Sequence, residues 1–219
     1  MIYEIFGLVK YDSSGVKKWT VQLGSTSVDY ADGVSVSSNG DIYITGYTEG
    51  SLEDLNSGEY DLFLAKFNSL GTKQWVNQLG TPSGDYGKDV SIDSYGNIYV
   101  TGYTKGELDN NTSIGQSDYF ILKFNSSGTK LWTRQSGTSR TDRAYGISND
   151  ISGNAFIAGY TYGGLDGNTN AGVTGADTML IKYNSSGTKQ WTKQLGTSDS
   201  DWATRISTDP NGNIYFTGI

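Results

Sequence analysis

The polar segment 166–177 has residue types and a spacing that could hold a metal ion. Asp166, Asn168 and Asn170 follow the D-x-N-x-N spacing of calcium loops, and Asp177 lies eleven residues after Asp166. Oxygen ligands at alternate positions can wrap a hard cation such as Ca²⁺. Calcium loops have Gly at the sixth position, where this chain has Ala171, and Asn-rich segments also form ordinary turns. Calcium binding is therefore one expectation, and the one we favour is a structural loop without a cofactor.

Catalytic chemistry finds little support in the composition. The 219 residues include no His and no Cys, which removes the commonest neutral-pH acid–base group and any thiolate nucleophile. Carboxylates are numerous, but adjacent residues such as Glu53 and Asp54 do not make a placed acid–base pair. We therefore expect that the protein is not an enzyme. The alternative is a polysaccharide lyase or hydrolase that uses surface carboxylates with calcium.

One aspartate recurs at the same place in a repeated pattern, as Asp29, Asp85, Asp142 and Asp201. A ring of four carboxylates could grip a cation over the axis of an array. An Asp that follows a turn rich in Ser, Thr and Gly more commonly caps local backbone N–H groups. We favour this structural role.

The positions that follow these aspartates are candidate ligand-binding positions. The next residue varies but stays large and planar, as Tyr30, Tyr86, Arg143 and Trp202. Planar groups on a loop face could stack on sugar rings or anchor a peptide, or they could simply cover the ends of the repeats. Four positions after each Asp the copies diverge to Gly33, Asp89, Gly146 and Arg205. Asp89 and Arg205 could bind a ligand on the inner side of the array or form a structural ion pair.

These residues belong to a sequence unit that is repeated four times. Trp19-Thr-Val-Gln-Leu-Gly has counterparts that begin at Trp75, Trp132 and Trp191, at separations of 56, 57 and 59 residues. Self-similarity at such a period indicates an array of like supersecondary units. Large aromatic residues belong to the core by default, so we expect these tryptophans to pack between units.

The second unit predicts four short strands, a to d, over residues 86–93, 97–104, 119–124 and 130–135. The turns between a and b and between c and d carry Asn or Gly, and no stretch has a helical period. Four short antiparallel strands per repeat are typical of a β-propeller blade, so the predicted fold class is all-β. A glycine recurs inside strand b, as Gly46, Gly102, Gly159 and Gly218, which predicts a bulge or a close backbone approach.

Only the b–c loop changes length between units. Each repeat Trp precedes the next Asp by ten residues, and each strand-c Asp (Asp61, Asp118, Asp177) precedes the next Trp by fourteen. In a propeller the b–c and d–a loops emerge on one face, and loops on a rigid scaffold commonly carry binding.

The chain is predicted to be a single domain over 1–219, with whole blades at 25–80, 81–137 and 138–196. Strands c and d in 1–24 and strands a and b in 197–219 would form a composite fourth blade, which leaves no unpaired sheet edge. One chain could close as a four-bladed ring, or two chains could exchange ends in an eight-bladed C2 ring. We favour the single-chain ring because its closure is intramolecular.

Three strings carry a family resemblance: Gly96-Asn-Ile-Tyr-Val-Thr-Gly-Tyr-Thr, Leu165-Asp-Gly-Asn-Thr-Asn-Ala-Gly and Lys182-Tyr-Asn-Ser-Ser-Gly-Thr-Lys-Gln-Trp. They closely resemble the bacterial SBBP β-propeller repeat family, over nearly the whole chain. The resemblance implies a propeller fold and occurrence in large secreted or cell-surface bacterial proteins. It implies no defined activity, because the family is recognised by its scaffold. The b–c loops 52–58 and 108–113 depart from the third string.

The remaining bulk properties bear on partners. A net charge of −7 argues against nucleic-acid binding, and no apolar run approaches the ~20 residues of a membrane span. We expect a non-catalytic, extracellular or cell-surface binding module whose b–c and d–a face takes a carbohydrate or a protein. The alternative is a structural or assembly module, as a monomer or a strand-swapped homodimer.

Overall fold

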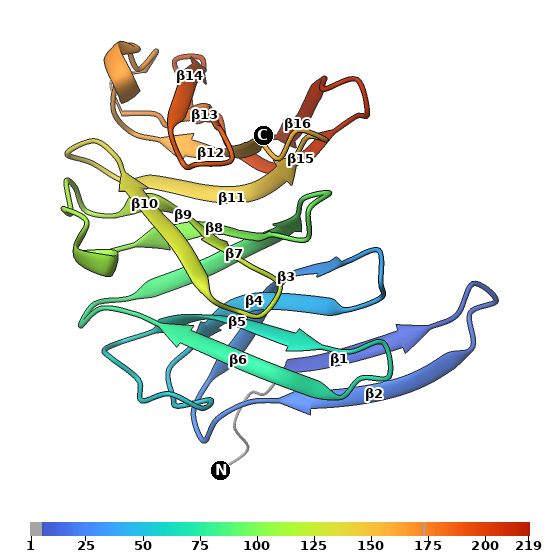
Figure 1. The fold of residues 1–219 in the computed structure, drawn as a ribbon. Coiled ribbons are helices and arrows are strands. Elements are labelled where there is room, and N and C mark those ends of the chain that lie inside the picture. The colour runs from blue at the N-terminus through green and yellow to red at the C-terminus, as the bar shows by residue number, and fades with distance from the viewer. Residues whose placement is uncertain (1–5, 173) are drawn as a thin grey trace.

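The computed structural model describes residues 6–172 and 174–219, and this part of the chain consists mainly of short antiparallel strands (Figure 1). The first blade contains β3 (Asp29–Val36), β4 (Ile42–Thr48), β5 (Asp61–Phe67) and β6 (Lys73–Leu79). The second contains β7 (Asp85–Ile92), β8 (Ile98–Thr104), β9 (Asp118–Phe124) and β10 (Lys130–Ser136). The third contains β11 (Asp142–Asn149), β12 (Ala155–Thr161), β13 (Asp177–Tyr183) and β14 (Lys189–Leu195). Strands a to d pair in sequence order in each blade, which confirms the predicted all-β propeller repeat.

Two further pairs of strands lie at the ends of the chain. Strands β1 (Phe6–Tyr11) and β2 (Lys17–Leu23) form a sheet that has only strands c and d. Strands β15 (Ala203–Thr208) and β16 (Ile214–Gly218) form a sheet that has only strands a and b. We call them the amino-terminal and carboxyl-terminal half-blades. Short 3₁₀ turns, η1 (Leu108–Asn110) and η2 (Leu165–Gly167), lie in the second and third b–c loops.

The predicted closure of a four-bladed ring by one chain is wrong for this structure. The blades stack face to face in an open arc, with β1–β2 at one end and β15–β16 at the other (Figure 1). Adjacent blades meet mainly through their inner strands, where β7 contacts β3 and β11, and β11 contacts β15. The two half-blades are therefore separate two-stranded sheets and do not pair with each other.

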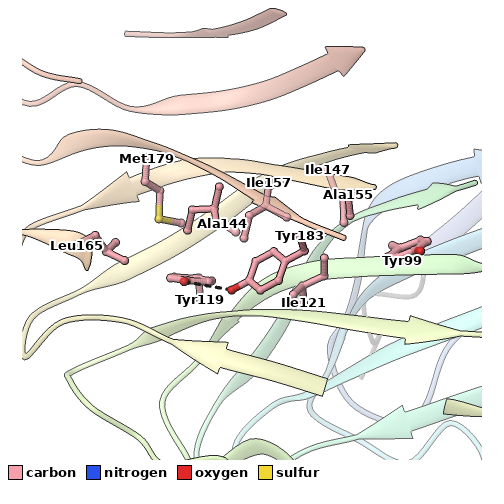
Figure 2. Close-up of a cluster of buried hydrophobic side chains, with 11 residues drawn as sticks. Tyr99, Tyr119, Ile121, Ala144, Ile147, Ala155, Ile157, Leu165, Met179 and Tyr183 are labelled. Carbon is pink, nitrogen blue, oxygen red and sulfur yellow. Dashed lines mark hydrogen bonds between the residues drawn. The ribbon is translucent and has the colours of Figure 1, made fainter. Parts of the chain in front are cut away.

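The core lies between blades, and strands b and c are buried because a neighbour covers both of their faces. Strands β8, β9 and β12 have every residue buried. Figure 2 shows the cluster between the second and third blades, where Tyr119 and Tyr183 bring their hydroxyl oxygens to 3.3 Å. Within the described residues, no helix has the length and apolar character that crossing a bilayer requires.

Three of the four repeat tryptophans pack between blades, as predicted. The indole rings of Trp19, Trp75 and Trp132 each lie against the c–d turn glycine of the next blade, which is Gly71, Gly128 or Gly187. These glycines have φ between +79° and +86°, and the indole leaves little room for a Cβ. Trp19 Nε1 also donates to Ser69 O at 3.3 Å in the same turn.

The strand-b glycines mark bulges, also as predicted. The register of strands a and b shifts at one place in each blade, between Gly87 and Asp89 in the second. A Cβ at Gly102 would overlap the carbonyl oxygen of Tyr86, and the other strand-b glycines meet the same backbone position. Only glycine permits that approach.

Candidate functional site

A glutamine clamp joins three segments on the loop face of each complete blade. It is the fourth residue of the repeated Trp motif, namely Gln78, Gln135 and Gln194. In the second blade Gln135 Oε1 accepts from Leu108 N at 2.9 Å, and Gln135 Nε2 donates to Gly106 O and Asp118 Oδ2, both at 2.9 Å. The clamp thus holds the start of the b–c loop against the first residue of strand c. The sequence analysis missed this role, although the Gln recurs in all four motifs.

The recurrent aspartates cap backbone groups, as favoured above. In the second blade Asp85 Oδ2 accepts from Thr81 N at 2.6 Å, and Asp85 Oδ1 accepts from the Thr104 hydroxyl. Asp29 and Asp142 make the same contacts, and Asp201 accepts from Thr197 N at 2.7 Å. These carboxylates are therefore used in holding each d–a loop on its blade.

Two of these aspartates have perturbed acidity. Burial raises the pKa of Asp85 and of Asp142, more than their threonine hydrogen bonds lower it. The neighbouring carboxylates of Asp61 and Asp118 raise these pKa values further. The members of each pair are buried at the first residues of a strand a and a strand c.

The planar residues form one continuous run across the blades. Within a blade they stack on the strand-b tyrosine, with ring centroids 5.0 Å apart for Tyr30 and Tyr47 and 4.7 Å apart for Tyr86 and Tyr103. Between blades the run continues from Tyr47 to Tyr86 at 4.9 Å, and the carbon Cζ of Arg143 lies 4.3 Å from the Tyr103 ring centroid. These planar side chains therefore contact one another both within and between blades.

The run ends at Trp202, whose ring stacks on Tyr160 at 5.2 Å. Burial raises the pKa of Tyr160 to about 12. Tyr160 thus keeps its phenolic proton at neutral pH.

Arg143 combines with neighbouring loops to line a concave site. A hollow of about 520 Å³ lies between the second b–c loop and the third blade. Its lining consists of Gln116, Arg140, Thr141, Arg143, Tyr160 and Tyr162. We call it the arginine hollow. Two guanidinium groups and two phenols line it, and none of the six residues is acidic.

The three loops that form the arginine hollow are tied together by backbone hydrogen bonds. Gln116 N donates to Arg140 O at 2.9 Å, and Tyr162 N donates to Thr141 O at 3.0 Å. The d–a and b–c loops therefore share one face, as predicted. A second hollow of about 550 Å³ adjoins the first and shares Arg140 and Tyr162 with it. Together they form an extended depression.

Arg143 is held in place as a cation. Its Nε donates to Ser117 Oγ at 3.3 Å. Burial lowers the pKa of this guanidinium, but the surrounding phenols of Tyr103 and Tyr160 raise it by more, so its net pKa is raised. A positioned, permanently charged planar group can recognise a carboxylate through two hydrogen bonds.

The sequence analysis identified Arg143 but missed Arg140 and Tyr162. Both lie where the copies disagree. The position of Arg140 is occupied by Ser27, Ser83 and Asp199 in the other units, and the position of Tyr162 by Glu49 and Lys105. An internal alignment that followed every divergent loop position would have found them.

Asp89 and Arg205 do not form the ion pair that was considered. The carboxylate of Asp89 accepts from Ile147 N at 3.0 Å, which joins the second blade to the third, and from Val90 N at 2.9 Å. Among the described residues no salt bridge links it to Arg205, whose Nη1 donates to Thr204 O at 2.8 Å. The Asp89 carboxylate is buried beside β11, and backbone N–H groups are its hydrogen-bond donors there. Arg205 lines a separate hollow with Asp32, Lys88 and Tyr145.

The four calcium-loop residues do not converge. Asp166 pairs with Lys189 at 2.7 Å, whereas Asn168 and Asn170 donate to backbone carbonyls of their own loop. Asp177 Oδ2 accepts from the clamp residue Gln194 at 2.9 Å. Across residues 6–172 and 174–219 there is no group of three or more acidic, His or Cys side chains that could hold a metal.

Comparison with known proteins places this geometry in a family. The model of the SBBP beta-propeller repeat matches residues 18–53, 74–109, 131–166 and 190–218, which is more than half of the chain. The chain belongs to the SBBP beta-propeller repeat family. Each matched range contains a strand d followed by strands a and b of the next unit, so the family repeat spans the boundary between blades.

Two curated proteins are similar in sequence to this chain. An uncharacterized WD repeat-containing protein of Acanthamoeba polyphaga mimivirus is 30% identical over 183 residues, which are 66% of this chain and 13% of that protein. The regulatory protein FlaEY of Caulobacter vibrioides is 27% identical over 191 residues, which are 75% of this chain and 20% of that protein. The SBBP chain therefore spans a small part of the length of either relative.

A solved structure supports the fold alone. A gluconolactonase of Xanthomonas campestris superposes with a TM-score of 0.53 at 11% identity, over 96% of this chain and 61% of that chain. The arc of blades in the SBBP chain thus corresponds to part of that larger molecule.

Proposed function

We propose that this SBBP chain is a non-catalytic binding module that takes an acidic carbohydrate in the arginine hollow. The observation that carries the proposal is the convergence of Arg140 and Arg143 with Tyr160 and Tyr162 in one depression that has no acidic lining residue. Guanidinium groups match carboxylates, and the phenol groups of tyrosines can exchange hydrogen bonds with the hydroxyls of sugars.

The local charge supports an anionic ligand over a neutral one. The chain carries a net charge of −7, yet two of its four arginines line this depression. In the first blade the position of Tyr162 is Glu49, so the corresponding region is acidic there. The two adjoining hollows that share Arg140 suit an extended chain of sugars.

A carbohydrate fits the shape of the site better than a peptide does. Peptide recognition uses buried apolar anchors or an open strand edge, whereas these two hollows are shallow and lined mainly by polar groups. A location outside a bacterial cell or on its surface is part of the same proposal, since acidic polysaccharides are abundant there.

The test is calorimetric titration with an oligosaccharide of galacturonic acid and with a neutral galactose oligosaccharide of equal length. The other repeats supply variants that should fold, because Arg140→Ser and Arg143→Tyr install the residues of the second blade, Ser83 and Tyr86. We expect the acidic sugar alone to bind, and each variant to weaken it by about tenfold or more, as loss of a charged hydrogen-bonding pair does.

Lys193→Asn is the matched control, because it removes one positive charge away from the hollow and installs the residue of the first blade, Asn77. It should bind as the original chain does. Equal binding of the neutral sugar, or unchanged binding by both arginine variants, would refute the proposal. Tighter binding of a glutamate-rich peptide than of the acidic sugar would reassign the site to a protein ligand.

A further inference from the structure

Each strand a contains one residue that has no partner in strand b. In the second blade the register shifts between Gly87 and Asp89, and the other a–b pairs shift at the same place. We call the residues left out of the ladder the bulge residues, and they are Asp32, Lys88, Tyr145 and Thr204. A bulge re-aims the side chain of its unpaired residue, and bulges are common beside functional sites.

The bulge is constant between units, whereas its residue varies. Every unit keeps the strand-b glycine that permits the bulge, such as Gly102 against the carbonyl oxygen of Tyr86. The four bulge residues are nevertheless an acid, a base, an aromatic residue and a hydroxyl residue. Because a bulge residue has no ladder partner, its side chain can change without disturbing the pairing of the strands. Repetition of the bulge can therefore supply different functional groups at equivalent places.

The four bulge residues meet in one hollow. It has a volume of about 490 Å³, and its lining consists of Asp32, Lys88, Tyr145, Thr204 and Arg205. These residues belong to the inner strands β3, β7, β11 and β15, which succeed one another along the arc (Figure 1). We call it the axial hollow. Its lining shares no residue with that of the arginine hollow.

The backbone holds the lining strands close together. A Cβ at Gly33 would lie 2.8 Å from Asp89 Cα, so β3 approaches β7 without room for a side chain. A Cβ at Gly146 would lie 3.1 Å from Ile206 N, so β11 approaches β15 in the same way. Between these pairs, Asp89 accepts from Ile147 N at 3.0 Å and joins β7 to β11. The axial hollow is therefore positioned by strands, which hold functional groups more precisely than loops do.

An ion pair lies on one side of the axial hollow. Lys88 Nζ is 2.8 Å from Asp32 Oδ2, and the Lys88 side chain is only 14% exposed. The same Nζ lies 5.1 Å from the ring centroid of Tyr47 and 5.8 Å from that of Tyr145. An ammonium group has three N–H donors and a carboxylate has two acceptor oxygens, so the pair keeps hydrogen-bonding capacity for the hydroxyl groups of a ligand.

Arg205 gives the lining its excess positive charge. Its Nη1 donates to Thr204 O at 2.8 Å, and within residues 6–172 and 174–219 no salt bridge includes it. The Asp89 carboxylate accepts from two backbone N–H groups and is not part of the lining. Since Lys88 and Asp32 balance each other, the axial hollow carries one positive charge in excess, beside a hydroxyl group and an aromatic ring.

We propose that the axial hollow binds a small hydroxycarboxylate, a molecule the size of one sugar ring with a single carboxylate and several hydroxyl groups. The Arg205 guanidinium can hold the carboxylate through two hydrogen bonds. The Asp32–Lys88 pair and the Thr204 hydroxyl then meet the hydroxyl groups of the ligand. A volume of about 490 Å³ lies within the usual range of small-molecule sites.

Calorimetric titration with D-glucuronate tests the site, with D-glucose and hexanoate as partial ligands. Glucose has the ring and the hydroxyl groups without the carboxylate, and hexanoate has the carboxylate without the hydroxyl groups. We expect glucuronate to bind once per chain and each partial ligand to bind about tenfold more weakly or less, because a buried partner is then left unpaired. Equal binding of glucose or of hexanoate would overturn the proposed ligand class.

Two variants locate the binding. Arg205→Gln removes the excess charge at an exposed position, and Lys88→Thr installs the bulge residue of the carboxyl-terminal half-blade, Thr204. Each should weaken glucuronate binding by about tenfold or more. Circular dichroism should show that both variants fold. Lys193→Asn, which removes one positive charge outside both hollows, should bind glucuronate as the original chain does.

Arg140→Ser separates this site from the arginine hollow. We expect it to leave glucuronate binding unchanged, because Arg140 does not line the axial hollow. Unchanged binding in Arg205→Gln, or loss of binding in Arg140→Ser alone, would overturn the proposal. If the acidic oligosaccharide fails to bind while glucuronate binds with the expected dependence on Arg205, the proposed function fails and the axial site stands.

Discussion

Removing the clamp amide of the first blade should be among the most damaging single changes on the loop face. Gln78 is 8% exposed, and its side chain makes three hydrogen bonds of 2.9 Å, to Leu52 N, Gly50 O and Asp61 Oδ2. Gln78→Leu keeps most of the volume but leaves a backbone N–H, a carbonyl and a buried carboxylate oxygen without this partner. Each lost bond costs about 1 kcal/mol and more where the group stays buried, so we expect about 3–5 kcal/mol in total.

That loss should lower Tm by roughly 10 °C, since about 1 kcal/mol moves Tm by about 2–4 °C in a domain of this size. The assay is thermal unfolding followed by circular dichroism at one protein concentration. Gln22→Leu is the matched control, because Gln22 has the same place in the repeated motif but is exposed. It should change Tm by no more than about 2 °C. Equal Tm values for the two variants would refute the assignment of the clamp.

Three further predictions concern the scaffold. Gly102→Ala should lower the free energy of unfolding by about 3 kcal/mol or more, because the added Cβ would overlap Tyr86 O. Gly96→Ala should lower it by about 1 kcal/mol, because Gly96 has a positive φ but open space around it. Urea unfolding measures both values. Burial raises the pKa of Asp85 above 3.8, so the folded chain binds this proton more tightly, and the stability it contributes should be full below pH 3.8 and be lost as pH rises through the raised value. Subtracting the unfolding free energies of Asp85→Asn from those of the original chain should reveal this slope, and a flat difference across that window would contradict it. Trp132→Ala should lower the free energy of unfolding by about 3–5 kcal/mol, because it removes the indole that packs on the Gly187 turn. Leu131→Ala, at a half-exposed position of the same strand, should lower it by under 1 kcal/mol in the same urea titration.

The strands and turns were predictable because their signals are local and repeated. Strand a of the second blade begins at Asp85 where the sequence predicted 86, and strand b begins at Ile98 where 97 was predicted. Fixed spacings from Trp132 to Asp142 and recurring turn glycines place each strand without knowledge of its neighbours. Gly102 was read correctly as a close approach for the same reason.

Closure was not predictable, because no local signal sets the angle between blades. That angle depends on how side chains such as Tyr99, Tyr183 and Ile147 pack against one another across an interface. Periodicity counts the blades but says nothing of their rotation. The arginine hollow was missed in part for a related reason: Gln116 comes from the second blade and Arg140 and Arg143 from the third, and the fold alone brings them together.

The clamp also has a consequence for how this family can vary. The clamp fixes the first residues of the b–c loop and the strand-c aspartate fixes the last. The two ends of the loop are therefore held in place whatever the length of the segment between them. Loop closure entropy grows slowly with length. Duplicated units can therefore acquire insertions between Leu108 and Asp118, or at the same place in another copy, without disturbing the strands on either side. The loop is the part of each repeat that selection, or a protein engineer, can rewrite while the rest of the blade stays the same.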